Sequence, residues 1–353
     1  MTRLNRYVMS HVLGMTVVTG LALIAIQTLI AYIAEIDEVG QGEFGYLALA
    51  QYILLQVPTG LNTLLPIIAM LGTMLGLGIL ASQGELVAMR ASGLSILRLG
   101  SATLSAGLVL AALSVVLGDW LAPAGQEQAE SLKTEARSGV APGVGGKTVW
   151  LREGGHIYRI DRLLGEHQFA DATVYSLDGD GGLKRVIAVG QARHEDGRWR
   201  FENLAVTEFG DRRTRAYRQP SMDWEGIDPD VLRLYVLEAY SLSTLGMYEL
   251  IQYLEHNGLD ASGYRLSFWR KLVAPFTVMA MMLLAVPFVL GPLRDSGAGQ
   301  RLLIGILIGL GFYVANEVSA SLGELFGWHP AVAASAPTGV VAAVAFWRLR
   351  QYR

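Results

Sequence analysis

The sequence LNTLLPIIAMLGTMLGLGILA at residues 61–81 continues without a break into SQGELVAMRASGLS at residues 82–95. The first stretch carries no charged residue, and about 20 apolar residues in a helix span a hydrocarbon core of roughly 30 Å. The second stretch is too polar to span a membrane and too apolar for an ordinary loop. The junction therefore predicts a transmembrane helix followed by a short amphipathic helix at the membrane surface.

Five further segments have the length and apolar composition of a transmembrane helix: residues 12–33, 97–117, 273–290, 302–322 and 331–347. A helix satisfies its backbone hydrogen bonds within the segment, which is necessary because the lipid hydrocarbon offers no hydrogen-bond partners. The first segment is interpreted as a retained anchor, because its apolar run exceeds the ~7–15 residues of a secretory signal. The chain is therefore expected to cross a membrane six times, in two groups of three.

The charged residues gather between these two groups of spans. Residues 122–262 contain 38 of the 59 charged residues, and the other 212 residues contain 21. A chain divided in this way is neither disordered nor a single soluble core. The absence of cysteine excludes disulfides, thiolate zinc sites and thiol nucleophiles. A net charge of -3 without a polybasic run argues against nucleic acid as a partner.

Lysine and arginine in the short loops predict how the spans are oriented. If the N-terminus is cytoplasmic, the outside short loops hold no basic residue, and they hold the acids Glu35, Asp37, Glu38, Glu43 and Glu324. The inside segments then hold nine arginines: Arg3, Arg6, Arg90, Arg98, Arg294, Arg301, Arg348, Arg350 and Arg353. We expect both termini in the cytoplasm and residues 122–262 outside it.

The polar insert has its own order of elements. Residues 126–138 are polar and helix-prone, and they are expected to prolong the third span into water. Further on, Trp199 and Phe201 alternate with charged residues, and similar runs occur at 148–152, 156–160, 172–177, 186–192 and 216–224. Short strands separated by turn clusters predict a meander that forms a sandwich, a jelly roll or an open barrel. Residues 243–257 predict a helix that ends at Gly258.

The predicted fold class is therefore a membrane protein of mixed α and β structure, with six transmembrane helices, three plus three, and an inserted β domain. The expected limits are 1–121 for the first three spans, 122–262 for the β domain and 263–353 for the last three spans. Residues 82–95 form the amphipathic segment inside the first of these regions.

No catalytic constellation is visible in the sequence. Residues 141–148, APGVGGKT, nearly match a phosphate-binding loop. Such a loop needs a strand before it and a helix after it, whereas here the predicted order is a helix and then a strand. His156, His167 and His194 lack metal-ligand spacing and are interpreted as solvated strand residues. We expect no cofactor, no metal and no enzymatic activity in this chain.

Few ionisable residues lie within or beside the spans, and such residues are functional candidates. Asp119 lies near the outer end of the third span, and Glu317 lies beside Asn316 in the fifth. Asn316 and Glu317 are candidate substrate or gate contacts, with a hydrated structural role as the alternative. The second span also carries three glycines whose spacing allows close helix packing: Gly72, Gly76 and Gly78.

Residues 82–95 are the most informative polar stretch of the membrane part. Glu85, Leu86 and Met89 fall at i, i+1 and i+4, which places a carboxylate beside an apolar surface, with Arg90 next to it and Gly93 as a stop. One interpretation is a helix that lies on the lipid headgroups. The other is a coupling helix that docks into a groove of a cytoplasmic partner, where Glu85 pairs with a basic residue.

This stretch also carries a resemblance to a known family. LGTMLGLGILA at 71–81, running into GELVAMRASG at 84–93, resembles the YjgP/YjgQ permeases, the lipopolysaccharide export permeases LptF and LptG. Other motifs resemble the LptG branch of that family more than the LptF branch: GQG at 40–42, GDWLAP at 118–123, DPD at 228–230 and FVLGPLR at 288–294. The resemblance covers nearly the whole chain.

The resemblance implies a subunit of an ABC transporter in the inner membrane of a Gram-negative bacterium, with a β-jelly-roll-like domain in the periplasm. The implied partners are an LptF-like permease subunit, an LptB-like cytoplasmic ATPase dimer and an LptC-like periplasmic bridge protein. The implied cargo is lipopolysaccharide, which needs a shielded route because each CH₂ exposed to water costs about 0.8 kcal/mol. Glu85 is implied as the contact with the ATPase.

One segment departs from the family. Relatives can carry basic residues at the outer end of the first span, where this chain has Glu35, Asp37 and Glu38. Recognition of lipid phosphates is then expected from the partner subunit, from a bridging divalent cation, or from basic residues before the fourth span, namely Arg265, Arg270 and Lys271.

Two other function classes stay open at this point. An ion-coupled secondary transporter needs a network of charges inside the membrane, which the sequence does not display. A membrane scaffold or sensor needs only an outer β domain that binds a partner. Co-purifying proteins and lipids distinguish these classes from an export permease.

Overall fold

The computed structural model describes residues 3–93, 95–138, 148–153, 155–165, 167–178, 182–195, 197–210, 213–225, 242–291 and 296–351. The chain divides into two compact units. The membrane unit comprises Met1–Ala34, Ile53–Gln126 and Ser262–Arg353. The sheet unit comprises Glu35–Tyr52 and Glu127–Ala261. The phosphate-loop-like stretch at 141–147 and the DPD motif at 228–230 lie outside the described residues, as does the PLR end, residues 292–294, of the motif at 288–294.

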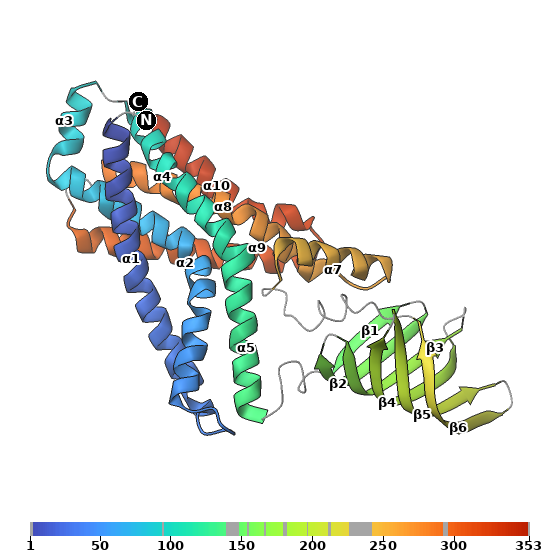
Figure 1. Ribbon diagram of the computed structural model, residues 1–353. Coiled ribbons are helices and arrows are strands. Elements are labelled where there is room, and N and C mark those ends of the chain that lie inside the picture. The colour runs from blue at the N-terminus through green and yellow to red at the C-terminus, as the bar shows by residue number, and fades with distance from the viewer. Residues whose placement is uncertain are drawn as a thin grey trace. The chain divides into compact units, whose positions relative to one another are not determined.

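Six helices of the described chain are long and apolar enough to cross a membrane, so the six predicted spans are confirmed. They are built on α1 Arg3–Glu35, α2 Tyr46–Ser82, α4 Ile96–Val116, α8 Ser262–Leu290, α9 Ala298–Phe326 and α10 Pro330–Gln351 (Figure 1). The most apolar window of α2 is 72% buried, whereas those of α1 and α9 are 11% buried. Helix α2 is therefore the centre of the membrane unit, and α1 and α9 present most of their apolar surface outward.

The third span continues as a helix beyond its apolar part. A π-helical turn at Leu117–Leu121 follows α4 and leads into α5, Ala122–Ser138. The predicted polar continuation at 126–138 is confirmed, because α5 contains it. The π-helical turn was not predicted, since it comes from a local change of hydrogen-bond register that composition does not encode.

The sheet unit contains one antiparallel sheet of six strands in consecutive order, which confirms the inserted antiparallel β domain. The strands are β1 Val149–Glu153, β2 His156–Gly165, β3 Gln168–Leu177, β4 Leu183–Glu195, β5 Arg198–Phe209 and β6 Thr214–Trp224. Trp199 and Phe201 are buried while Arg198 and Arg200 are exposed, as their alternation predicts. Trp224 donates from Nε1 to the Tyr158 hydroxyl at 2.9 Å, and burial raises the pKa of Tyr158 to about 12.

The helix predicted at 243–257 is also confirmed. Helix α7 spans Thr244–His256, and the Ser243 side chain caps it by accepting a hydrogen bond from the Gly246 amide at 3.1 Å. Gly258 follows the helix with a φ of 65°, a left-handed conformation that glycine adopts without strain. The start and stop signals in the sequence therefore identified both ends of this helix.

Candidate functional site

The amphipathic segment after α2 forms a short helix, α3, at Glu85–Ala91. Gly84 and Gly93 flank it with φ angles of 78° and 88°. Leu86 is buried in the membrane unit's core, with Met89 packed against the same core. Arg90 and Val87 are exposed. The outward surface of α3 therefore combines an acid, a base and the apolar Val87, which the sequence analysis did not single out.

Glu85 is tied to the N-terminal end of α1. The Tyr7 hydroxyl donates a hydrogen bond to Glu85 Oε1 at 3.1 Å. The Tyr7 ring lies 4.4 Å from the His11 ring, centroid to centroid, on the next turn of α1. Both chain termini and α3 lie at the same end of the membrane unit (Figure 1). The Tyr7 hydroxyl therefore links α3 to the first turns of α1.

The three glycines of α2 lie where neighbouring helices come closest. A Cβ at Gly72 would meet the backbone of Thr16 in α1, with its nitrogen at 2.7 Å. A Cβ at Gly76 would lie 2.9 Å from the Cα of Val12, also in α1. Gly78 instead faces Arg301 of α9, whose Cζ would lie 2.8 Å away. These glycines let α1 and the start of α9 pack directly on the central helix.

The sequence predicts Arg301 in a cytoplasmic loop, but the structure places it within a helix. It lies in the first turn of α9, and only 3% of its surface is exposed. Gly78 provides the space for its guanidinium. A loop arginine and a buried one look alike in sequence, because the distinction depends on the glycine of another helix.

Two consecutive basic residues of α8 make ion pairs with two different helical segments. Arg270 donates from Nη2 to Glu317 Oε2 and to the Asn316 carbonyl oxygen, both at 3.2 Å, in α9. Lys271 donates to the Gly118 carbonyl oxygen at 2.9 Å and lies 3.7 Å from Asp119 Oδ1, in the π-helical turn. The structure thus pairs four of the polar residues that the sequence singles out, Arg270 with Glu317 and Lys271 with Asp119. Arg265 lies exposed in the first turn of α8.

These two ion pairs are expected to differ in strength. Lys271 and Asp119 are largely buried, with 16% and 27% of their side chains exposed, whereas Glu317 is 60% exposed. Lys271→Met should cost about 1.5–3 kcal/mol of stability, and Arg270→Met less than about 1 kcal/mol. Arg270 also has a buried Nε without a partner in the described chain, which reduces its net benefit. Thermal unfolding of both variants and the wild type in detergent measures these losses of stability.

The control for this prediction is a double-mutant cycle of Lys271→Met with Asp119→Asn. If the ion pair carries the cost, the two substitutions together should cost less than the sum of their separate effects. Equal losses for Arg270→Met and Lys271→Met, or strictly additive losses in the cycle, would contradict this ranking.

The acidic segment at the C-terminal end of α1 is neutralised within the sheet unit. Lys133 Nζ of α5 lies 2.8 Å from Glu35 Oε2 and 2.8 Å from Glu38 Oε2, and 5.0 Å from the centre of the Tyr52 ring. Arg137 adds a 3.4 Å contact to Glu38. The sequence displays the acids but not which cations pair with them, because about 100 residues separate the partners. Two of the three carboxylates are therefore already paired, and Asp37 is exposed.

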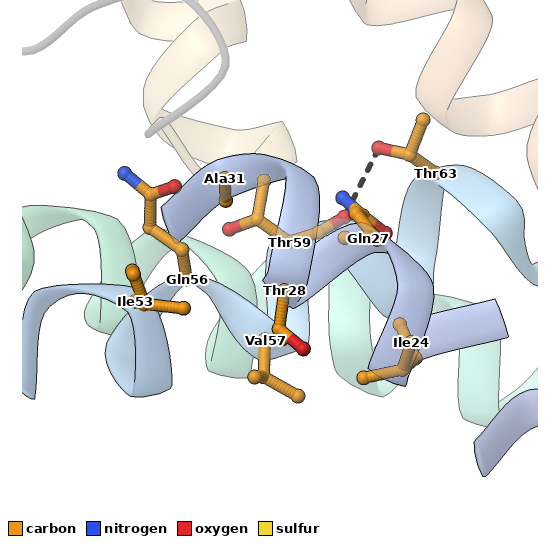
Figure 2. Close-up of a pocket in the computed structure, with 10 residues that line it drawn as sticks. Ile24, Gln27, Thr28, Ala31, Ile53, Gln56, Val57, Thr59 and Thr63 are labelled. Atoms are coloured by element: carbon orange, nitrogen blue, oxygen red, sulfur yellow. Dashed lines mark hydrogen bonds between the residues drawn. The ribbon is translucent and has the colours of Figure 1, made fainter. Parts of the chain in front are cut away.

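A small pocket lined by both polar and apolar side chains lies between α1 and α2 in the membrane unit. It has a volume of about 90 Å³ and is lined by Ile24, Gln27, Thr28, Ala31, Ile53, Gln56, Val57, Thr59, Gly60 and Thr63. Figure 2 shows Gln27 and Gln56 toward opposite ends of it. Nothing in the sequence analysis pointed to this pocket, because glutamine and threonine are unremarkable singly and only the helix pairing gathers them.

The histidines of the sheet unit are distributed over its strands and turns. The His156 Nδ1 lies 2.9 Å from the Ser176 hydroxyl, and burial lowers the pKa of His156. The rings of His167 and His194 lie 5.8 Å apart, centroid to centroid. Within the described residues, no group of three or more histidine, aspartate or glutamate side chains is placed to hold a metal ion.

Comparisons with known proteins agree over the length of the chain. A family model described as "Lipopolysaccharide export system permease LptF/LptG" matches residues 6–351. A protein named lipopolysaccharide export system permease protein LptG, from Escherichia coli strain K12, is 28% identical over 350 residues, which cover 98% of this chain and 97% of the relative. A protein of the same name from Haemophilus influenzae is 29% identical over 353 residues, covering 99% of each.

Proposed function

The chain belongs to the family of lipopolysaccharide export permeases LptF and LptG, and from that membership we propose its place in the export machine. It is the LptG-type transmembrane subunit of an ABC transporter that extracts lipopolysaccharide from the outer leaflet of the inner membrane. A separate cytoplasmic ATPase powers the extraction, and a periplasmic bridge protein receives the lipid. The observation that carries this proposal is α3, a short helix between two spans with a carboxylate at its first position.

Two features of α3 support its role as the contact with the ATPase. Leu86 and Met89 fix the helix to the membrane unit's core, so that α3 moves with the spans and not separately from them. Glu85, Val87 and Arg90 are left to face a partner. Because α3 is packed on the spans on one side and charged on the other, a conformational change of the ATPase that binds α3 is transmitted to the spans.

The exposed apolar surfaces of helices α1 and α9 support the proposal that a second permease subunit binds this chain. Both present rows of large apolar side chains outward, among them Leu21, Leu29 and Ile33 on α1 and Leu307, Leu310 and Val314 on α9. Such surfaces contact either lipid or another membrane helix. In the proposed machine, an LptF-like subunit packs against this chain and the two together enclose the lipid cargo.

The orientation of the sheet unit follows from the loop charges. With the termini in the cytoplasm, the sheet unit lies in the periplasm, where an LptC-like bridge protein docks. Where relatives can carry basic residues at the outer end of α1, this chain has carboxylates that Lys133 neutralises. Phosphate recognition is therefore assigned to the partner subunit, or to basic residues such as Arg265.

Tyr7→Phe is expected to weaken coupling without affecting the fold. The substitution removes the hydroxyl that holds Glu85 but keeps the ring against His11. Loss of one hydrogen bond to a carboxylate should reduce lipid-stimulated ATP hydrolysis about three- to ten-fold. The matched control is Tyr32→Phe, also on α1, whose hydroxyl makes no hydrogen bond in the described chain. Equal hydrolysis in wild type and Tyr7→Phe would show that Tyr7 does not position Glu85.

The proposed function is tested by isolating the chain from its own membrane in mild detergent and identifying what accompanies it. An ATPase, a second six-span permease and lipopolysaccharide should co-purify. An outer-domain partner without any ATPase or lipid would instead support the scaffold function and overturn the proposal.

A further inference from the structure

Arg301, in the first turn of α9, is a buried charge within a membrane span. Only 3% of its surface is exposed, and it is the one charged residue among the described residues that are buried. Moving a charge out of water costs free energy, so an ionisable residue kept inside a span is a candidate for a function. The helix packing around Arg301 indicates which function that is.

The first turns of α9 pack directly on α2. A Cβ at Gly305 would lie 3.0 Å from Met74 Sδ, and a Cβ at Gly309, one turn later, would lie 3.0 Å from Ile67 Cγ2. Glycines at these positions let the two helices approach closely. Arg301 precedes Gly305 by one turn and lies on the same side of α9, so it continues the contact toward the C-terminal end of α2.

Arg301 meets α2 close to the end that carries α3. A Cβ at Gly78, four residues before α2 ends at Ser82, would lie 2.8 Å from Arg301 Cζ. A cation is favoured near the C-terminal end of a helix, where the carbonyl groups carry partial negative charge. The junction that follows is itself hydrogen-bonded, since the Gln83 amide donates to the Ile79 carbonyl oxygen at 3.0 Å. The buried guanidinium therefore lies next to the last turns of α2, which lead directly into α3.

We propose that Arg301 is a positioning residue for coupling. It holds the start of α9 against the end of α2, so that α9 and α3 move together when the ATPase moves α3. A guanidinium carries five N–H donors in a fixed plane, and its burial is tolerated only where those donors are satisfied, so its place along α2 is fixed. The glycines let the helices approach, but an apolar contact of this kind does not prevent one helix from sliding along the other.

The inference rests on the proposed function, because it takes α3 to be the contact with the ATPase. It extends that function from α1, which Tyr7 links to Glu85, to α9 on another side of α2. With 3% of its surface exposed, Arg301 contacts neither the lipid cargo nor the ATPase directly. Its replacement should therefore change the communication between the two and leave the binding of each in place.

The test uses the complex of this chain, its permease partner and the ATPase in lipid nanodiscs. ATP hydrolysis per assembled complex is measured with and without purified lipopolysaccharide, and the ratio of the two rates is the stimulation. Arg301→Met removes the charge and keeps an unbranched side chain. It should lower the stimulation at least about five-fold, the lower end of typical coupling between two sites, with affinity for the ATPase within about two-fold of wild type. Arg301→Lys keeps a cation and should retain about half of the stimulation or more.

Two further variants complete the test. Gln300→Met is the matched control, an exposed neighbour on α9 given the same new side chain, and it should leave the stimulation unchanged. Gly78→Ala places a methyl group where the guanidinium lies. It should lower the stimulation in the wild-type background and cause no further loss in Arg301→Ala, where that space is free.

The inference is overturned if Arg301→Met is stimulated like wild type, or if the effects of Gly78→Ala and Arg301→Ala are strictly additive. A role in folding alone would reduce the amount of assembled complex but not the stimulation of the fraction that assembles, which also overturns it. The proposed function fails separately, if lipopolysaccharide does not stimulate the wild-type complex at all.

A wild-type complex that is stimulated normally, beside an Arg301→Met complex that is stimulated equally, removes only the role given to Arg301.

Discussion

Replacing Glu85 by arginine is expected to abolish productive coupling between this chain and its ATPase. Glu85 is the acidic residue of α3 and lies in its first turn. A carboxylate at that position interacts favourably with the helix dipole. Reversing its charge would place an arginine against the basic partner surface that the proposed function requires, and it removes the acceptor of the Tyr7 hydroxyl. Losing such a pair at an interface costs about 2–5 kcal/mol, so affinity for the ATPase should fall about 30-fold or more.

The measurement is binding of the purified ATPase to the permease complex, together with lipid-stimulated ATP hydrolysis. Glu249→Arg is the matched control, an exposed acid on α7 of the sheet unit, and it should leave both quantities unchanged. Unchanged assembly and hydrolysis in Glu85→Arg would contradict the role given to this carboxylate. A variant that binds lipid normally yet no longer stimulates hydrolysis would locate the defect in coupling, as expected.

Replacing Gly72 by valine should have the largest effect on the fold of the membrane unit. A Cβ there collides with the α1 backbone at Thr16, and a backbone cannot move aside as the end of a side chain can. The Thr16 hydroxyl is already bonded to the Val12 carbonyl oxygen, so this turn of α1 is fixed. Helix α1 must separate from α2, at a cost of about 1–3 kcal/mol or more, as in overpacked cores. The expected result is a strongly lowered melting temperature and loss of protein from the membrane.

The control for the packing prediction is Gly14→Val on α1. A Cβ at Gly14 meets nothing within 4 Å, so the same change of residue should leave the melting temperature nearly unchanged. If the Gly72→Val and Gly14→Val variants have the same melting temperature, then α1 and α2 do not pack in the described way.

Much of this architecture could be predicted from the sequence, because the signals involved are local. The six spans follow from the length of apolar runs, the strands from two-residue alternation around Trp199 and Phe201, and helix α7 from Ser243 and Gly258 at its ends. Each signal lies within the element that it predicts, so no knowledge of the rest of the chain is required.

The features that could not be predicted depend on pairs of distant residues. The sequence displays the acids Glu35 and Glu38, but only the folded chain places Lys133 between them. The sequence predicts Leu86 and Met89 beside Glu85 on α3, but only the folded chain shows that both pack on the membrane unit's core. The sequence predicts the basic residues Arg270 and Lys271 of α8 as candidates for binding phosphate, and in the structure both contact carboxylates.

The intramembrane charges bear directly on the alternative of an ion-coupled carrier. Arg270 pairs with Glu317, and Lys271 pairs with Asp119, so each acid has a cation beside it. The pair of Lys271 with Asp119 is largely buried, whereas Glu317 is 60% exposed and its pair with Arg270 contributes little to stability. Under the proposed function, the energy for transport comes instead from the ATPase that contacts α3.

The most direct test is transfer of lipopolysaccharide from proteoliposomes that contain this chain, its permease partner and the ATPase to a soluble periplasmic acceptor. Transfer should require both ATP and the ATPase, and it should fall to background when Glu85→Arg replaces the wild-type chain. Transfer that proceeds without the ATPase when an ion gradient is imposed, or that continues undiminished in Glu85→Arg, would contradict the account.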